Sequence, residues 1–137
     1  MLTLIVPAYN EAEGGGAVVR EARQALDGAG LVHEIIVVDD GSTDGTGAEA
    51  AAAGARVITH PANGGYGRSL KHGIMESRYD LIAISDAVGT YPVDALPGML
   101  RRLGGFDMVV GAGVGGGGGP IGFLHQIRDP CPLSLAL

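Results

Sequence analysis

The sequence has no tryptophan and few other aromatic residues, with four tyrosines and two phenylalanines in 137 residues. Proteins that hold single-stranded nucleic acid stack its bases on aromatic rings, so this scarcity argues against such a surface. The formal net charge of −6 also argues against broad electrostatic binding to nucleic acid. We therefore expect no nucleic-acid partner.

The sequence also shows no sign of a disulfide, a membrane-spanning helix or a secretory leader. Cys131 is the single cysteine, so no internal disulfide is possible, and a reducing compartment is the simplest prediction. No segment offers the ~18 uninterrupted apolar residues that a membrane-spanning helix needs. Met1 leads directly into a strand-like run without a basic leader, which predicts no secretory signal. Together these features predict a cytoplasmic protein.

Glycine, in contrast, is abundant, at 25 of 137 residues, and much of the excess lies in residues 14–16 and 111–119. Before the second run, predicted strands and helices alternate regularly. After it, the chain shows no clear period, and two closely spaced prolines discourage a helix. We therefore predict a domain at residues 1–111 and a glycine-rich, irregular tail at residues 112–137.

The hydrophobic pattern of the domain alternates between strand and helix. Apolar, β-branched runs predict strands at residues 2–6, 34–38, 56–59, 80–85 and 107–110. The segments between them predict helices at residues 17–29, 47–53, 66–77 and 93–103. This alternation predicts an α/β fold with a doubly wound, mostly parallel sheet.

Three of the predicted strands are followed directly by acidic loops. The first loop is Pro7–Glu11, the second Asp39–Thr46 and the third Asp86–Pro92. Ligands of open parallel sheets bind at the carboxyl ends of the strands, which meet at one edge. Carboxylates gathered there suit a hard cation, and such a cation can hold a pyrophosphate.

The second loop begins Asp39-Asp40-Gly41-Ser42. A carboxylate here can accept hydrogen bonds from a nucleobase or from ribose hydroxyls, and Gly41 permits a tight turn. The same residue types also favour a plain turn and helix cap, and that alternative stays open.

The other two loops have similar pairs of interpretations. Tyr9 could pack on a nucleobase while Glu11 bonds to the base or ribose; alternatively, Tyr9 is half-buried core and Glu11 an ordinary first-turn acid. Asp86 could bind a divalent ion that bridges phosphates, or simply cap a helix.

The segment Asn63–Gly67 is rich in glycine and is followed by Arg68 and Lys71, which could meet phosphate. Its spacing is not that of a Walker loop. The first predicted strand is also not followed by G-x-G-x-x-G, which counts against a nicotinamide or flavin site.

The histidines show no metal-ligand spacing with one another or with Cys131. We expect each of them at the surface or in a loop. They are His33, His60, His72 and His125.

Taken in order, these segments resemble the nucleotide-sugar domain of family-2 glycosyltransferases, which has a GT-A, Rossmann-like fold. Within that family they are most similar to the dolichyl-phosphate mannose synthase and polyprenyl-phosphate glycosyltransferase branch. The resemblance covers about Met1 to Gly111. It implies a nucleotide-sugar site formed by Pro7, Ala8, Tyr9, Glu11, Val38, Asp40, Asp86 and Ala87.

The resemblance also implies an activity. Such enzymes transfer a sugar from a GDP- or UDP-linked donor to an acceptor, often a polyprenyl or dolichyl phosphate. The implied cofactor is Mg²⁺ or Mn²⁺, held by Asp86, which offsets charge on the departing diphosphate. A lipid-phosphate acceptor would bring the protein to the cytoplasmic face of a membrane.

The chain departs from the family pattern in three places. The family's Asp-x-Asp reads Asp86-Ala87-Val88 here, so the second carboxylate is missing. The basic residue usual after the fifth strand is absent from Gly111-Ala112-Gly113. The chain then ends without the family's acceptor-site elements, as a truncated or frame-shifted gene product would.

These departures lead to further expectations. Metal binding should be weak, sugar transfer impaired, and apolar surface left uncovered, which favours self-association. A nucleotide-sugar-binding remnant without catalysis is therefore an alternative to an active transferase. A nucleotidyltransferase of similar fold is a weaker alternative, because Pro7–Glu11 lacks its glycine-rich basic signature.

Overall fold

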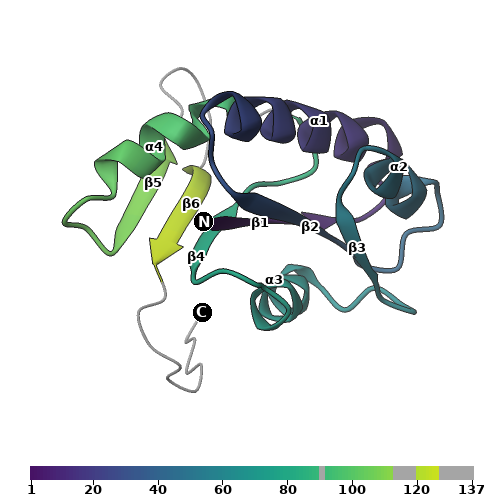
Figure 1. Ribbon diagram of the computed structural model, residues 1–137. Coiled ribbons are helices and arrows are strands. Elements are labelled where there is room, and N and C mark those ends of the chain that lie inside the picture. Colours follow the sequence, from purple (N-terminus) through teal and green to yellow (C-terminus); the bar gives the residue numbers. More distant parts are fainter. Residues whose placement is uncertain (90–91, 113–119, 127–137) are drawn as a thin grey trace.

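The computed structural model describes residues 1–89, 92–112 and 120–126, and their core is a twisted sheet (Figure 1). Its strands are β1 (Leu2–Ala8), β2 (His33–Asp39), β3 (Arg56–Thr59), β4 (Leu81–Ile84), β5 (Met108–Ala112) and β6 (Pro120–Gln126). They lie in the order β3-β2-β1-β4-β6-β5. β1 is parallel to both β2 and β4, and β3 is parallel to β2. The predicted mostly parallel α/β fold is therefore confirmed.

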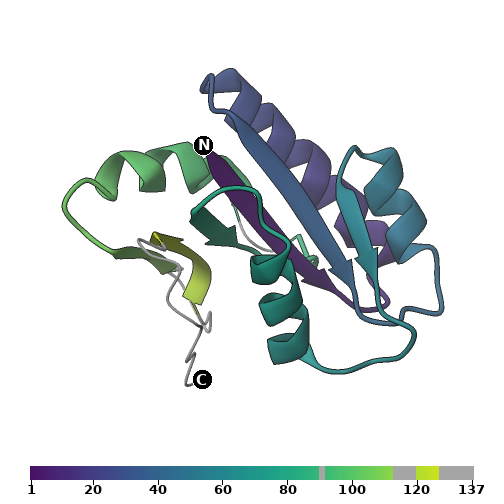
Figure 2. The ribbon, with the colours of Figure 1, turned by 60° about the horizontal axis from the view of Figure 1, so that its bottom comes forward.

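The helices cover both faces of this sheet. They are α1 (Ala12–Gly28), α2 (Thr46–Ala52), α3 (Tyr66–Met75), the 3₁₀ turn η1 (Val93–Ala95) and α4 (Leu96–Arg102). Figures 1 and 2 show α1, α2 and α4 on one face and α3 on the other. Covering both faces explains why the middle of each central strand, such as Leu4–Val6 and Ile35–Val38, is continuously apolar and does not alternate with polar residues.

Alternate residues of the central strands point to opposite faces of the sheet and belong to two apolar clusters. Leu4, Val6 and Val37 lie in the larger one, packed with α1 and α2. Ile5 and Val38 lie in the smaller one, together with partly buried residues of α3. All five of these side chains are completely buried, so the carboxyl ends of β1 and β2 are held rigidly.

α1 begins at Ala12, five residues before the predicted start, and runs through the three glycines at residues 14–16. Its first turn packs tightly against the third loop, because a Cβ atom at Gly14 would overlap the carbonyl oxygen of Ala87. The helical propensity of glycine is low, which explains the late predicted start. Here the close approach of two backbones favours glycine instead.

The predicted irregular tail is wrong for residues 120–126, which form β6. This strand lies between β4 and β5 and is antiparallel to both, with Ile84 opposite Phe123 and Met108 opposite His125. Strand formation depends on the pairing partners more than on the local sequence. The lack of a hydrophobic period in the tail therefore did not exclude a strand. Residues 113–119, which hold the Gly115–Gly119 run, and residues 127–137 lie outside the described part. The domain boundary at residue 111 stays a prediction.

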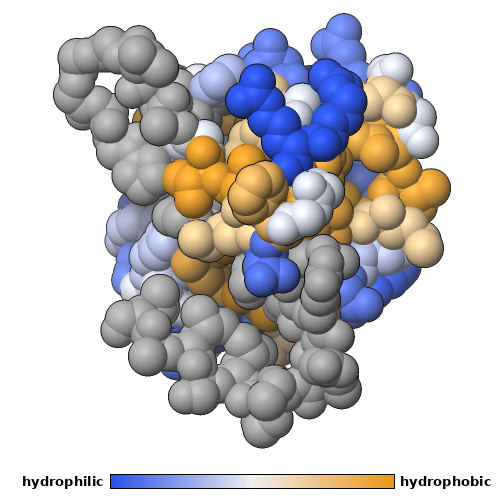
Figure 3. Space-filling view, turned by 90° about the vertical axis from the view of Figure 1, so that its left-hand side faces the viewer, coloured by the Kyte–Doolittle hydropathy of each residue, from blue (hydrophilic) through white to orange (hydrophobic). Residues whose placement is uncertain are grey.

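β5 leaves apolar side chains on the surface. Phe106, Met108 and Val110 are 64%, 52% and 43% exposed, and Figure 3 shows apolar residues gathered on this side of the molecule. The predicted self-association would use such a surface, and it stays a prediction. Within the described ranges, no helix has the length and apolar character needed to span a membrane.

Candidate functional site

The three acidic loops meet at one edge of the sheet, as predicted. β1 lies between β2 and β4 and pairs in parallel with each, so all three strands end on the same side. In the registers, Ala8 is opposite Asp39 and Ile5 is opposite Ile84. Glu11, Asp40 and Asp86 therefore all follow strands that end at this edge.

Several hydrogen bonds connect the first loop to the second. The backbone N–H of Asn10 donates to Ser42 Oγ at 2.9 Å, and Asn10 Oδ1 accepts from the backbone N–H of Thr43 at 2.9 Å. The backbone N–H of Glu11 donates to Thr46 Oγ1, also at 2.9 Å. The hydroxyl groups of the second loop thus hold the chain entering α1, whereas neither α1 nor α2 has a side-chain cap at its own N-terminus.

The two adjacent aspartates have different partners. Asp39 Oδ1 accepts from the backbone N–H of Ser42 at 3.0 Å, which closes the turn around Gly41. Asp40 reaches across to the loop after β3. Its carboxylate accepts from His60 Nδ1 at 2.7 Å, from the backbone N–H of Gly64 at 3.0 Å and from that of Gly65 at 2.8 Å.

These bonds determine the charge of Asp40, which is only 4% exposed. Burial raises the pKa of the Asp40 carboxyl group. The hydrogen bonds from His60, Gly64 and Gly65 lower the pKa by more, so it lies below its ordinary value of 3.8. Asp40 is therefore a carboxylate at neutral pH and can act only as a hydrogen-bond acceptor.

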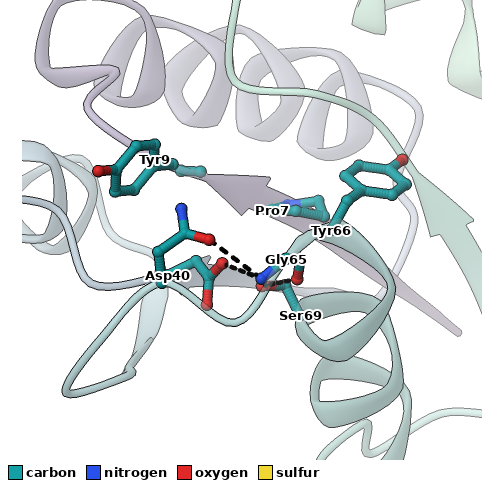
Figure 4. A pocket seen from close by; sticks show the side chains of 8 residues that line it. Pro7, Tyr9, Asp40, Gly65, Tyr66 and Ser69 are labelled. Atoms are coloured by element: carbon teal, nitrogen blue, oxygen red, sulfur yellow. Dashed lines mark hydrogen bonds between the residues drawn. The ribbon is translucent and has the colours of Figure 1, made fainter.

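Asp40 also lines a pocket at the sheet edge, with a volume of about 130 Å³. Figure 4 shows Tyr9 on one side of this pocket and Tyr66 on the other, with Pro7, Asp40, Gly65 and Ser69 between them. Tyr9 is 47% exposed and belongs to neither apolar cluster, which favours the pocket role over a half-buried core residue. Ala8 and Asn63 complete the lining. An apolar wall with one ionised acceptor is typical of a site for a flat, polar-edged ring.

Four of the eight predicted site residues line this pocket: Pro7, Ala8, Tyr9 and Asp40. Glu11 is the N-cap residue of α1 but makes no side-chain cap. Val38 points into the apolar cluster beneath α3 and is completely buried, so its side chain cannot touch a ligand there. The proposed roles of all eight residues in nucleotide-sugar binding stay predictions.

Asp86 and Ala87 lie in the third loop, directly after β4. Asp86 is partly exposed, and its Oδ1 accepts from the backbone N–H of Val88 at 3.2 Å. Val88 is 52% exposed and carries no ligand atom. In the part of the chain that the structure describes, no group of three histidine, cysteine or carboxylate side chains could hold a metal. A cation at this loop would therefore need most of its ligands from a bound phosphate and from water.

The sequence pattern missed part of the pocket and one buried histidine. Tyr66 and Ser69 of α3 line the pocket, and neither was among the predicted site residues. His60 lies in the loop after β3, in agreement with the prediction for the histidines, but its side chain is buried there, at 4% exposed. Its partners Asp40 and His72 lie 20 and 12 residues away, so no local pattern could reveal them.

The comparison with known families identifies the chain. A model of glycosyl transferase family 2 matches residues 3–132. The chain belongs to glycosyltransferase family 2. The match extends through β6, which agrees with the place of that strand in the sheet.

Several relatives support this family membership. A glucosyl-3-phosphoglycerate synthase of Mycolicibacterium smegmatis is 36% identical over 80% of this chain and 39% of that protein. A dolichyl-phosphate β-glucosyltransferase of Trichomonas vaginalis is 33% identical over 74% of this chain and 33% of its own length. The chain spans less than half the length of these curated relatives.

A solved structure shows the same fold with ligands. Glucosyl-3-phosphoglycerate synthase of Mycobacterium tuberculosis was crystallised with Mn²⁺, uridine diphosphate (UDP) and phosphoglyceric acid. It superimposes with a TM-score of 0.64 at 29% identity, over 75% of this chain and 38% of the other. The GT-A fold expected from the resemblance is thus confirmed.

We predict that Gly41→Ala destabilises the protein by more than the roughly 1–2 kcal/mol that a left-handed conformation costs other residues. Gly41 has φ of +81°, and a Cβ atom there would lie 2.7 Å from backbone atoms of Ala62 and Asn63. Urea unfolding measures this loss. Gly45→Ala is the control, because Gly45 lies in the same loop at φ −82° with open space around it. Equal stability of the two variants would contradict the prediction.

We also predict a loss of stability in acid that depends on Asp40. The folded-state pKa of Asp40 lies below 3.8, so the unfolded chain binds the proton more readily. Asp40 therefore stabilises the fold fully above that pH, and the contribution disappears as the pH falls through the lower folded pKa. Urea unfolding between about pH 6 and about pH 3 should show a shallower decline for Asp40→Asn than for wild type. A variant of the exposed Asp80, Asp80→Asn, should follow the wild-type curve, and a wild-type slope in Asp40→Asn would refute the prediction.

Proposed function

We propose that this chain binds a nucleoside-diphosphate sugar at the carboxyl edge of its sheet and belongs to a transferase that passes the sugar to an acceptor. The observation that carries the proposal is the pocket between Tyr9 and Tyr66 with the ionised Asp40 at its wall. Its volume of about 130 Å³ is well below the ~300 Å³ at which pockets for whole drug-sized ligands begin. The pocket therefore suits one ring of the nucleotide, with the diphosphate and sugar extending along the edge.

The residues divide between the two ends of such a donor. Tyr9 offers a ring face and Asp40 a carboxylate acceptor to the base or ribose, with Pro7 and Ala8 forming the wall between them. Asp86 follows the neighbouring strand β4 and would face the diphosphate, whereas Ala87 beside it is 1% exposed and would act only through its backbone. Uridine is the base we favour, because the structural relative from Mycobacterium tuberculosis holds UDP.

A divalent cation, Mn²⁺ or Mg²⁺, is the proposed cofactor. The described donors fit it only in part: Asp86 supplies one carboxylate, and the diphosphate and water would supply the other ligands. A metal bound there would offset the negative charge that develops on a leaving diphosphate. The packing of Gly14 of α1 against Ala87 holds the third loop, and with it Asp86, in place.

The acceptor is proposed to be a phosphorylated compound, and a polyprenyl phosphate is the favoured class. Relatives include an undecaprenyl-phosphate 4-deoxy-4-formamido-L-arabinose transferase from Pseudomonas paraeruginosa and the dolichyl-phosphate β-glucosyltransferase. Such an acceptor would place the protein at the cytoplasmic face of a membrane. Glucosyl-3-phosphoglycerate synthases are also among the relatives, so phosphoglycerate is the competing acceptor.

One observation favours a second candidate, a domain that binds the donor without transferring sugar. Val88 stands where the family pattern has a second carboxylate, so the described loop offers one ligand fewer to a metal. Binding and transfer separate the two candidates. A remnant would bind UDP but release no UDP from UDP-glucose with a polyprenyl phosphate or phosphoglycerate present.

Calorimetric titration of the full 137-residue chain tests the proposal. UDP and GDP would be titrated separately, each with and without Mn²⁺, followed by UDP-glucose and GDP-mannose. We expect saturable binding of UDP that Mn²⁺ strengthens, and weaker binding of GDP. If neither nucleotide binds under any of these conditions, the proposed function is wrong.

We predict that Tyr9→Ala weakens UDP binding by about 0.5–1.5 kcal/mol, the range for a stacked aromatic pair. Tyr9 lines the pocket and is 47% exposed, so its removal leaves the core intact. Phe106→Ala is the matched control, since Phe106 is also an exposed aromatic residue but does not line the pocket. Equal affinities of the two variants for UDP would exclude Tyr9 from the site.

A further inference from the structure

A line of three side chains runs inward from α3 to the pocket wall. His72 Nδ1 lies 2.8 Å from His60 Nε2, and His60 Nδ1 lies 2.7 Å from Asp40 Oδ1. The two ring planes are nearly parallel, inclined by 5°, and the ring centroids lie 5.1 Å apart. This separation is as long as two ring radii and the 2.8 Å between the nitrogens placed end to end, so the rings meet edge to edge through an in-plane hydrogen bond and their faces do not overlap.

The charge of Asp40 determines where the protons lie along this line. Because the carboxylate is ionised and can only accept, His60 must donate through its Nδ1–H. A neutral His60 then has only the lone pair of Nε2 left, so His72 must donate to it through its own Nδ1–H. When both rings are neutral, each ring therefore carries its proton on Nδ1, and the direction of every bond in the line is fixed.

The same carboxylate supports the opposite wall of the pocket. Besides His60, it holds the backbone N–H groups of Gly64 and Gly65, and Gly65 itself lines the pocket. A carboxylate has roughly four acceptor positions, and these three donors occupy most of them. The acceptor position left for a ligand is therefore determined by these donors, of which His60 contributes a side chain and the two glycines contribute backbone.

We propose that His60, supported by His72, is a positioning residue of the nucleotide site: it fixes the Asp40 carboxylate so that one acceptor position faces an N–H or hydroxyl group of the bound nucleoside. This inference rests on the proposed nucleotide binding. It assigns no contact between either histidine and the ligand. Loss of the His60 donor would free the carboxylate to rotate, and both Asp40 and the Gly64–Gly65 segment would lose their fixed places.

Paired substitutions test this role through UDP binding to the full-length chain. His60→Leu removes the donor, whereas the side-chain nitrogen of His60→Asn can take the place of Nδ1. We expect the Kd for UDP to rise about tenfold or more in His60→Leu and to return to within about threefold of wild type in His60→Asn. His72→Leu should give a smaller rise, because it removes only the outer bond. His33→Leu is the control, since His33 lies at the other end of β2 and its ring contacts Leu31 and Asp27.

A second measurement needs no nucleotide, and its first part uses only the wild-type chain. Nitrogen-15 spectra of the wild-type histidine rings, recorded at mildly alkaline pH, should show His60 and His72 protonated on Nδ1 and not on Nε2. The amide resonances of Gly64 and Gly65 should shift in His60→Leu and return toward their wild-type positions in His60→Asn.

The possible failures are distinct. A His60 ring protonated on Nε2, or an unchanged Kd in His60→Leu while wild type binds UDP, would overturn the positioning role and leave the proposed function standing. Failure of His60→Asn to restore binding lost in His60→Leu would also overturn it, because a matching donor would then not be what the site needs. Failure of wild type to bind UDP or GDP would overturn the proposed function, and this inference with it.

Discussion

Asp40→Ala is expected to weaken the binding of UDP by about 1–3 kcal/mol, the range for leaving a buried polar partner unpaired. This corresponds to a Kd roughly 5 to 150 times higher. Two losses combine in this variant. The ligand loses its charged acceptor, and the amide groups of Gly64 and Gly65 lose the carboxylate that holds them at the pocket wall.

The measurement is calorimetric titration of wild type and variant with UDP, with the folded fraction checked by circular dichroism. Asp80→Ala serves as the control, because Asp80 is an exposed aspartate that does not line the pocket. Asp40→Asn is a second variant that keeps the shape of the side chain and one acceptor oxygen. Its NH₂ group would face the N–H donors of His60, Gly64 and Gly65. An unchanged Kd in a folded Asp40→Ala variant would remove Asp40 from the binding site.

Val88→Asp is expected to raise the affinity for Mn²⁺ by about tenfold or more when UDP is bound, which corresponds to ~1.4 kcal/mol or more. The substitution adds a hard oxygen ligand and a negative charge two residues from Asp86. The local turn is suited to it, because the N–H of Val88 already donates to Asp86 Oδ1. Val88 is 52% exposed, so the replacement leaves no cavity in the core.

Titration of Mn²⁺ into the chain saturated with UDP measures this change, and sugar release from UDP-glucose gives a second readout. Val88→Asn is the matched control, because it supplies an oxygen of nearly the same position without the charge, and it should give a smaller gain. If wild type binds Mn²⁺ as tightly as Val88→Asp does, the second carboxylate is not what this site lacks. If Val88→Asp binds the metal more tightly but transfers no sugar, the binding-only candidate is favoured.

The sequence by itself determined the layout of the parallel part of the fold. An apolar run such as Ile35–Val38 can bury all its side chains only in a strand that is covered on both faces. The structure buries these residues under α1 and α3. Because parallel strands point the same way, the acidic loops that follow β1, β2 and β4 had to meet at one edge. The sequence also predicted that Tyr9 and Asp40 lie at this edge, because each follows directly after the strand that positions it.

Only the tertiary structure decided the rest, and in each case the reason is contact between distant segments. β6 forms because β4 and β5 offer hydrogen-bond partners, although its own residues show no strand period. α1 extends through three glycines because backbone of the third loop packs against Gly14, where propensity alone predicts coil. His60 is buried because Asp40 and His72, far away in the sequence, satisfy both of its ring nitrogens. Local pattern reports which residues prefer a strand, a helix or a turn, but partners supplied by other elements determine which polar groups can be buried and which edges can pair.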